Sequence, residues 1–147
     1  VGYNYRMTDL QAAVGLVQLS RLDAMLERRR SLAARYTERL ADLEWLTPPA
    51  VPEGCLPNYQ SYMVLFQPDA PVSRDEMMQG MLDRSIATRR GIMATHRERP
   101  YLPGEWDKVL PVTNQVTDSA MILPLYHEMT EEDQDWVVES LKEIARG

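Results

Sequence analysis

An apolar pattern with spacings of three and four residues runs through the first third of the chain and constrains the fold more than any other feature. It comprises these positions: Leu10, Val14, Val17, Leu22, Met25, Leu26, Leu32, Tyr36, Leu40 and Leu43. Such spacing indicates a long helix, or two helices with a bend, that buries one stripe. Thr8 and Gln11 fit a capping box at its start. The proline-rich run 47–52 ends the helical pattern.

The next segment carries the signals of a strand followed by a capped helix. Residues Tyr62–Phe66 are apolar and β-favouring, which predicts a strand. Ser73 and Glu76 fit a second capping box, so we expect a helix to begin after Ser73. Three side chains are expected on its buried side, where the methionines fill the core: Met77, Met81 and Leu82.

The last third of the chain predicts short strands, an irregular stretch and a closing helix. Short strands are expected around Ile86–Thr88 and at Ile122–Leu125, and a short helix at Thr113–Met121. Between residues 91 and 111, prolines and a glycine interrupt regular structure. The closing helix begins at Thr130, and its acidic first turn suits the helix dipole. Its expected buried face consists of Trp136, Val137, Leu141 and Ile144.

The order of these elements predicts an α+β fold with a small antiparallel or mixed sheet flanked by helices. A chain of 147 residues is long enough to bury a core of its own. Residues 1–46 are expected to form the long helical segment, and residues 58–147 the α/β part of the domain.

The net charge of the chain disfavours nucleic acid as a partner. The formal value is −6, whereas binding phosphate backbones requires a basic face. The run Arg28-Arg29-Arg30 lies beside Glu27 in the predicted helix, where we interpret it as a solvated, partly paired surface.

The few cysteines and histidines and the short apolar stretches argue against disulfides, metal sites and membrane spans. A single cysteine, Cys55, excludes an internal disulfide and a cysteine-rich zinc site, and it is interpreted as an incidental thiol. The two histidines show no metal-ligand spacing, so no metal is expected. The longest apolar stretch, Ala12–Val17, is far shorter than a membrane span. The default expectation is a cytoplasmic protein without a membrane partner.

Residues 2–13, at the start of the chain, read GYNYRMTDLQAA. This stretch resembles the pattern GxNxRM(T/S)x(L/I)xAA of the DegT/StrS-type sugar aminotransferases. The likeness continues in order to the other end of the chain, at residues 61–64, 86–92, 96–101 and 123–130.

The resemblance implies the C-terminal small domain of a fold-type I aminotransferase. In that family a large N-terminal domain carries the lysine that forms a Schiff base with pyridoxal 5′-phosphate (PLP), and the working unit is a homodimer with shared active sites. Lys108 and Lys142 are the only lysines here, and neither resembles the family's Schiff-base context. Residues 1–46 would bridge to the missing large domain. The chain alone is therefore expected to be inactive, with no catalytic residue of its own.

Two candidate site residues belong to the motif at the start of the chain. The resemblance implies that Asn4 reaches across the dimer to the cofactor phosphate of the other subunit. The alternative is an Asx-type turn ahead of the capped helix. Arg6 is a candidate for binding a substrate anion, or for bracing the segment by pairing with an acid such as Asp9.

The remaining candidates lie between residues 89 and 101. His96 and Tyr101 match an H-x-x-x-x-Y pattern in a family loop near the substrate, where the histidine would position a sugar hydroxyl or a diphosphate oxygen. The alternative is a loop histidine bonded to nearby backbone. Arg90, with Arg89 before it, is a candidate ligand of a nucleotide diphosphate, because guanidinium groups suit phosphate. The alternative is a solvated pair.

The function implied by the resemblance is transfer of an amino group, with glutamate as the usual donor, to a nucleotide-linked keto sugar. PLP is the electron sink in such a reaction, and this part of the enzyme would supply geometry. The alternative is a stand-alone dimerisation or regulatory module derived from an aminotransferase.

Overall fold

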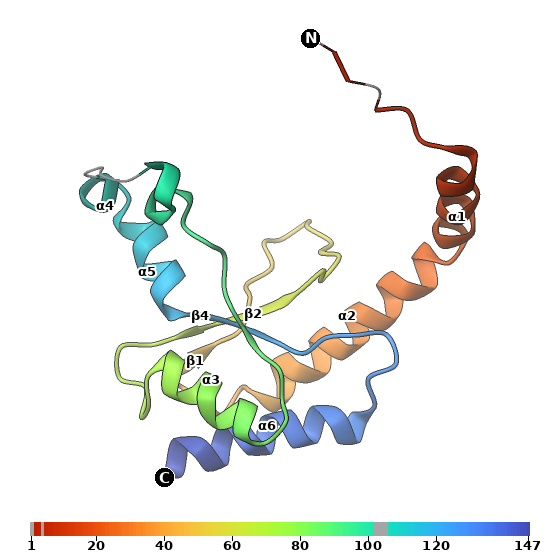
Figure 1. Cartoon of the computed structure of the whole chain (residues 1–147). Helices are drawn as coiled ribbons and strands as arrows, with labels where there is room; N and C mark the ends of the chain where they lie inside the picture. Colours follow the sequence, from red (N-terminus) through yellow and green to blue (C-terminus); the bar gives the residue numbers. More distant parts are fainter. Residues whose placement is uncertain (1, 4, 102–105) are drawn as a thin grey trace.

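The computed structural model describes residues 2–3, 5–101 and 106–147. Its α-helices, 3₁₀ turns (η) and strands follow one another in this order: α1 (Asp9–Ser20), α2 (Leu22–Arg39), β1 (Leu46–Thr47), β2 (Tyr62–Phe66), α3 (Arg74–Asp83), β3 (Arg89–Arg90), η1 (Thr95–Arg97), η2 (Arg99–Tyr101), α4 (Trp106–Val109), α5 (Pro111–Ser119), β4 (Ala120–Leu123) and α6 (Glu131–Arg146). They form an α+β domain around one small sheet (Figure 1).

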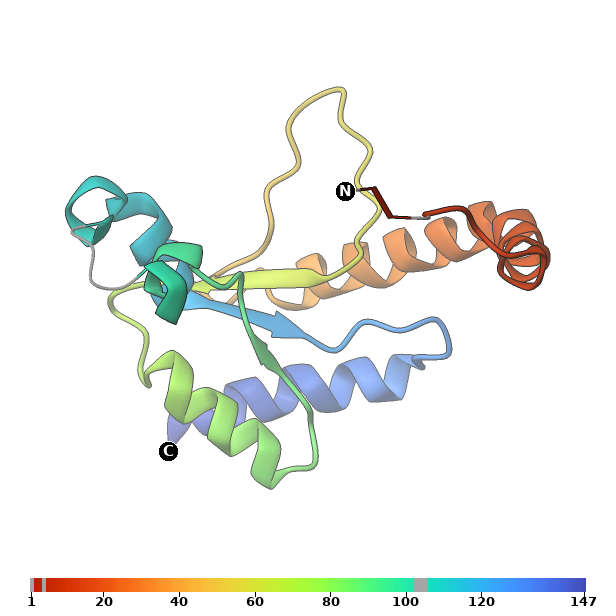
Figure 2. The ribbon, with the colours of Figure 1, turned by 45° about the horizontal axis from the view of Figure 1, so that its top comes forward.

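The sheet has the strand order β1-β2-β4-β3, and each adjacent pair is antiparallel. Side chains alternate between its faces, so that Tyr62, Val64 and Phe66 are buried while the residues between them are half-buried. Helices α3 and α6 lie beneath the sheet, and the loop of residues 48–61 rises on the other side (Figure 2). The sheet is therefore covered by helices on one face.

Helix α2 completes the core through its second half. Leu32, Tyr36 and Leu40 are buried, and the Tyr36 ring lies 5.1 Å from that of Tyr62. The Tyr36 hydroxyl donates to the carbonyl oxygen of Pro124 at 3.0 Å. Because burial favours the neutral phenol, the pKa of Tyr62 is raised to about 12 and that of Tyr36 above its usual range.

The predicted helical stripe divides at Arg21, between α1 and α2, and only its later part is buried. Helix α1 has its predicted capping box but no buried residue. Leu10, Val14 and Val17 were expected in the core, yet each is more than half exposed. That expectation was wrong for this chain, because nothing in the described residues covers α1.

Several boundaries also differ from the sequence-based expectation. Helix α2 ends at Arg39, well before the proline run, and Leu46 pairs with Phe66 in a strand that was not predicted. The strand expected at Ile86–Thr88 is found at Arg89–Arg90. The reason is a turn after α3, in which Ser85 has a φ of 63° and the amide of Ile86 donates to Met81.

Two side chains expected in the core are exposed. Leu82 is 61% exposed and Trp136 is 51% exposed. Leu82 follows the buried Met81, and Trp136 precedes the buried Val137. Because adjacent helical residues are rotated by about 100° about the axis, these side chains point away from the buried face. The buried face of α6 instead includes Gln134, whose side-chain amide donates to the carbonyl oxygen of Leu32 at 2.9 Å.

The three consecutive arginines of α2 are structural, which corrects the interpretation of a solvated surface. Arg28 donates to the carbonyl oxygens of His127 and Met129, at 3.4 and 2.6 Å. Arg29 and Arg30 donate to carbonyls of residues 57–60 at the base of the protruding loop, at 2.9 to 3.2 Å. Because consecutive residues point to different sides of a helix, α2 holds two separate loops.

Candidate functional site

A hollow with a charged lining lies between the edge strand β3, the turn η1 and the end of α5. Its volume is about 670 Å³. We call it the arginine pocket, and its lining residues are Arg74, Arg89, Arg90, Gly91, Ile92, Met93, Ala94, Arg97, Glu98, Thr117, Asp118 and Ile122. It contains Arg90, one of the predicted substrate ligands, and also Arg89.

Gly91 shapes this pocket by letting two segments cross closely. A Cβ atom at Gly91 would lie 2.3 Å from the Cβ of Ala120, closer than carbon atoms can approach. The Gly91 amide donates to the carbonyl oxygen of Ala120 at 3.0 Å. This close contact holds the end of β3 against the start of β4. The residues that follow Gly91 then line the hollow.

Two of the four arginines are committed to the pocket's own framework. Arg74, whose side chain is 10% exposed, donates to the carbonyl oxygens of Thr117 and Ala120, at 3.2 and 3.0 Å. Arg97 forms two hydrogen bonds to the carboxylate of Asp118, at 2.6 and 3.2 Å. Neither residue was predicted from the sequence, because these contacts join segments 21 to 46 residues apart.

His96 lies beside this pocket with its ring turned into the domain. The residue is 9% exposed, and Nε2 lies 2.8 Å from the side-chain oxygen of Asn114 on α5. That contact fastens η1 to α5, which fits a structural histidine better than a free substrate ligand. Sequence inspection could not find Asn114, since an asparagine 18 residues away carries no pairing signal.

Tyr101 stands at the rim of a second, more apolar hollow of about 400 Å³. Its lining residues are Met93, Ala94, Thr95, His96, Tyr101, Leu110 and Thr113. Tyr101 is 51% exposed, so its ring is accessible from solvent. The structure thus brings Arg90, His96 and Tyr101 into one region, on two adjoining hollows.

The motif at the start of the chain lies elsewhere. Asn4 falls outside the described residues, and Arg6 is exposed in the segment that leads into α1. Helix α1 lies at the opposite side of the domain from α4 and α5 (Figure 1). Among the described residues, the predicted site residues therefore fall into two separate groups, with Arg6 in one and Arg90, His96 and Tyr101 in the other.

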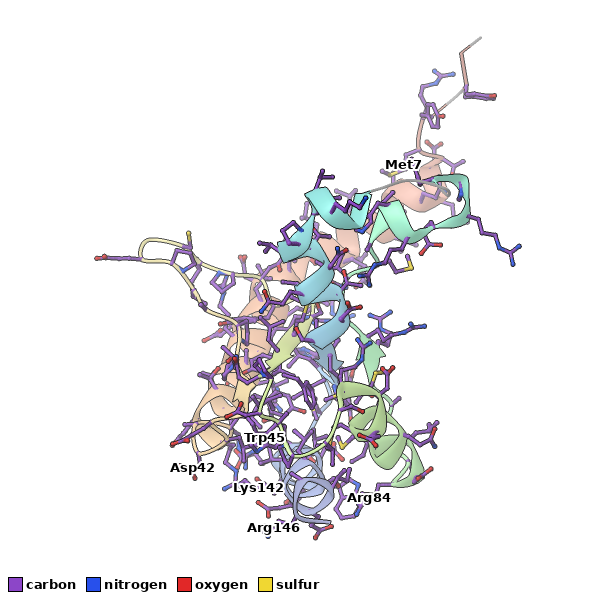
Figure 3. All side chains as sticks on the ribbon, turned by 90° about the vertical axis from the view of Figure 1, so that its left-hand side faces the viewer. Met7, Asp42, Trp45, Arg84, Lys142 and Arg146 are labelled. Atoms are coloured by element: carbon purple, nitrogen blue, oxygen red, sulfur yellow. The ribbon has the colours of Figure 1, made fainter. Side chains whose placement is uncertain are left out.

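The two lysines do not supply an amine to either group. Lys142, on α6, lies 3.7 Å from the carboxylate of Glu139 and is at the far end of the molecule from Met7 (Figure 3). Lys108 is exposed on α4 and lines none of the hollows described above. The residues present therefore do not fit a covalently held PLP, and no step through that cofactor is derived for this chain.

Two other kinds of site are absent from the described part of the chain. Among residues 2–3, 5–101 and 106–147, no group of three histidine, cysteine or acidic side chains is placed to hold a metal ion. No helix in the same residues has the length and apolar character needed to cross a membrane.

The fold is shared with solved aminotransferases. The aminotransferase TlmJ from Streptoalloteichus hindustanus is 27% identical and superposes with a TM-score of 0.83 over 95% of this chain and 37% of its own. The sugar aminotransferase CalS13 from Micromonospora echinospora is 26% identical, with a TM-score of 0.76 over 97% of this chain and 37% of its own.

A third neighbour, from Streptococcus pneumoniae, is 24% identical and superposes with a TM-score of 0.86 over 96% of this chain and 36% of its own. That protein was solved in a PLP form, a PMP form and an apo form. The chain thus spans little more than a third of the length of these proteins.

The family model of the DegT/DnrJ/EryC1/StrS aminotransferases matches residues 1–142. This family is PLP-dependent. The match covers nearly the whole chain, and the structural neighbours place the same fold in the C-terminal portion of longer enzymes. The chain belongs to the DegT/DnrJ/EryC1/StrS aminotransferase family, as a C-terminal portion with the α+β fold of its small domain.

Proposed function

We propose that this chain is the C-terminal part of a cytoplasmic, PLP-dependent homodimeric enzyme that transfers an amino group from glutamate to a nucleotide-linked keto sugar. The family match over residues 1–142 carries the proposal. The structural similarity to the sugar aminotransferase from Micromonospora echinospora supports it as well. In this proposal the chain positions substrate, and residues outside it hold the cofactor covalently.

Helix α1 with the segment before it is the part of residues 1–46 that we propose to bridge to the large domain. The second half of α2 is already occupied in the core of the small domain. The exposed apolar side chains of α1 and its leading segment support this role, and they are Tyr3, Tyr5, Met7, Leu10, Val14, Leu16, Val17 and Leu19. Exposed apolar side chains gathered on one element in this way typically mark an interface.

The two separate groups of site residues fit a dimer with shared active sites. Asn4 would donate to the cofactor phosphate of the other subunit, and Arg6 would bind a substrate anion there. Arg90 would bind substrate within the arginine pocket, with Tyr101 at the neighbouring rim. His96 would act through its bond to Asn114, by holding η1 in place beside the substrate.

Cofactor trapping tests whether the lysine that holds PLP covalently lies outside this chain. Purified chain mixed with PLP and then reduced with borohydride is expected to show no stoichiometric adduct by intact mass. A polypeptide that also carries the large domain is expected to be labelled once. The chain variants Lys108→Arg and Lys142→Arg serve as controls for slow surface labelling. A stoichiometric adduct at either lysine of the chain alone would refute the proposal that the covalent anchor lies elsewhere.

Amino transfer tests the reaction itself. The polypeptide with both domains is expected to convert a nucleotide-linked keto sugar to the amino sugar with glutamate as donor, measured by mass spectrometry of the product. The chain alone should give no product. Turnover by the chain alone, or no turnover of any nucleotide-linked keto sugar by the longer protein, would contradict the proposed function.

A further inference from the structure

A separate hollow of about 320 Å³ lies between the turn after α2 and the C-terminal end of α6. We call it the Trp45 hollow, and its lining includes Asp42, Leu43, Trp45, Pro71, Lys142 and Arg146. Four of these residues are seen together at the end of the molecule far from Met7 (Figure 3). The Trp45 hollow shares no lining residue with the arginine pocket or with the hollow beside Tyr101. None of the site residues predicted from the sequence therefore accounts for it.

The aromatic wall of this hollow is held in place by the fold. The Trp45 ring lies 5.7 Å from that of Phe66, and the Trp45 carbonyl oxygen accepts from the amide of Gln67 at 2.8 Å. The turn before it is closed by the amide of Leu43, which donates to the carbonyl oxygen of Leu40 at 3.0 Å. Since the backbone and the ring of Trp45 are both fixed within the chain, the wall is formed before any ligand binds.

Charges of both signs line the hollow without pairing with one another. Lys142 and Arg146 are four residues apart, so they lie on one face of α6, and Asp42 belongs to the turn after α2. Lys142 lies 3.7 Å from Glu139, and no ion pair among the described residues joins Asp42 to either cation. Cations at the end of a helix suit its dipole, but the dipole does not account for an acid in the same hollow. The lining thus offers an anionic and a cationic contact at separate points.

We propose that the Trp45 hollow binds a free α-amino acid with an aromatic side chain. At neutral pH such a molecule carries one carboxylate and one ammonium group. The carboxylate pairs with the guanidinium fork of Arg146 and with Lys142, and the ammonium group pairs with Asp42. The inference does not depend on the proposed amino transfer, because it uses none of the residues assigned to that reaction.

The size and the apolar lining of the hollow select the kind of amino acid. Trp45 offers a ring face, with Leu43 and Pro71 beside it, and aromatic pairs are more stable than their buried area alone implies. A volume of about 320 Å³ is at the lower end of small-molecule sites, which suits a single amino acid better than a nucleotide. An amino acid without a ring would leave the aromatic wall uncovered.

NMR titration of the ¹⁵N-labelled chain with L-phenylalanine tests the site through the tryptophan itself. The indole N–H signal of Trp45, identified by its loss in Trp45→Phe, should shift and saturate with a dissociation constant on the order of 1 mM, as expected for a small ligand in an open hollow. The signal of Trp136, in the first half of α6, should not move. L-Alanine should bind at least about tenfold more weakly, because it lacks the ring.

Two analogues with a single charge assign the two ends of the ligand. 3-Phenylpropanoate lacks the ammonium group and phenethylamine lacks the carboxylate, so each should bind about three- to fivefold more weakly than phenylalanine, as for exposed ion pairs. Asp42→Asn should weaken phenylalanine by the same factor without weakening 3-phenylpropanoate. Arg146→Gln should weaken phenylalanine without weakening phenethylamine.

The matched controls Asp23→Asn and Arg21→Gln remove the same charges at exposed positions at the start of α2, and they should leave the affinity within about 1.5-fold. The ¹⁵N spectrum of each variant shows whether it is folded. Four results would each overturn the proposal: no saturable shift of Trp45 below about 10 mM phenylalanine, alanine binding as tightly as phenylalanine, full affinity in Asp42→Asn, or equal losses in controls and hollow variants. Family membership and amino transfer would stand in every case.

Discussion

Helices α1 and α2 are separated by a single residue, yet they lie in opposite environments. The second half of α2 packs in the core through Leu32 and Tyr36, while α1 has no buried residue. Both begin from clear helical patterns in the sequence. A helical pattern in the sequence therefore identifies an apolar face. Whether that face is buried depends on the presence of a neighbouring surface.

The apolar residues of α1 fall on two opposite sides of the helix. At about 100° per residue, Leu10, Val14 and Val17 share one side, and Leu16 and Leu19 share the other. A helix that is apolar on most sides is normally enclosed by protein. In the proposed enzyme, the large domain and the second subunit supply the surfaces that enclose α1.

The largest effect is expected from truncating the core tyrosine of α2. Tyr36 is fully buried and bonded to Pro124, so Tyr36→Ala should lower the free energy of unfolding by about 3–5 kcal/mol. The matched change in α1, Leu16→Ala, should cost less than about 0.5 kcal/mol in the isolated chain. Urea unfolding followed by circular dichroism measures both. Comparable losses would mean that α1 belongs to the same cooperative core.

A smaller loss is expected where α2 holds the loop before α6. Arg28→Met removes the donors to His127 and Met129, and we expect a loss of about 2 kcal/mol, because charged donors to buried carbonyls contribute more than neutral ones. Arg21→Met, at the junction between the helices, is the control and should be nearly neutral. If the two variants unfold at the same urea concentration, Arg28 does not stabilise the loop.

High pH should also lower the free energy of unfolding, through ionisation of a buried tyrosine. The pKa of Tyr62 is raised to about 12, so the unfolded state loses its proton above pH 10 while the folded state keeps it. Stability is therefore full below pH 10 and declines as the pH rises toward 12, by roughly 1 kcal/mol after allowance for solvent screening. Unfolding curves at pH 9 and pH 11.5 measure the decline. Tyr62→Phe should make it shallower, and an unchanged slope would assign the effect to other groups.

The smallest effects compare two capping boxes of the same design. Thr130 caps α6 and Thr8 caps α1, and each hydroxyl accepts from an amide three residues later. Thr130→Ala should cost about 1 kcal/mol of global stability. Thr8→Ala should leave the unfolding midpoint unchanged and lower only the helical signal. A midpoint shift with Thr8→Ala would show that α1 unfolds together with the core.

Local signals in the sequence predicted the parts of the fold that depend on neighbouring residues. The capping boxes at Thr8 and Ser73, the start of the closing helix at Thr130 and the strand Tyr62–Phe66 are confirmed. Such features rest on contacts three or four residues apart or on a run of one residue class. The burial of Met77 and Met81 is confirmed for the same reason.

Contacts between distant segments could not be predicted from one sequence. The carbonyls that Arg28 binds lie about a hundred residues away, and β1 and β3 are too short to show an alternating pattern. In the candidate site, the sequence pointed to Arg90, but the framework of Arg74 and Arg97 emerged only from the fold. The roles of Arg6, Arg90 and Tyr101 remain predictions, and Asn4 lies outside the described residues.

Amide hydrogen exchange of the isolated chain, resolved by peptide mass spectrometry, tests the contrast between the two helices most directly. The account predicts slow exchange in β2, β4, α6 and the second half of α2, and exchange in α1 that is faster by orders of magnitude. Protection of α1 equal to that of α2, in a monomeric sample, would contradict the claim that α1 awaits a surface from outside this chain.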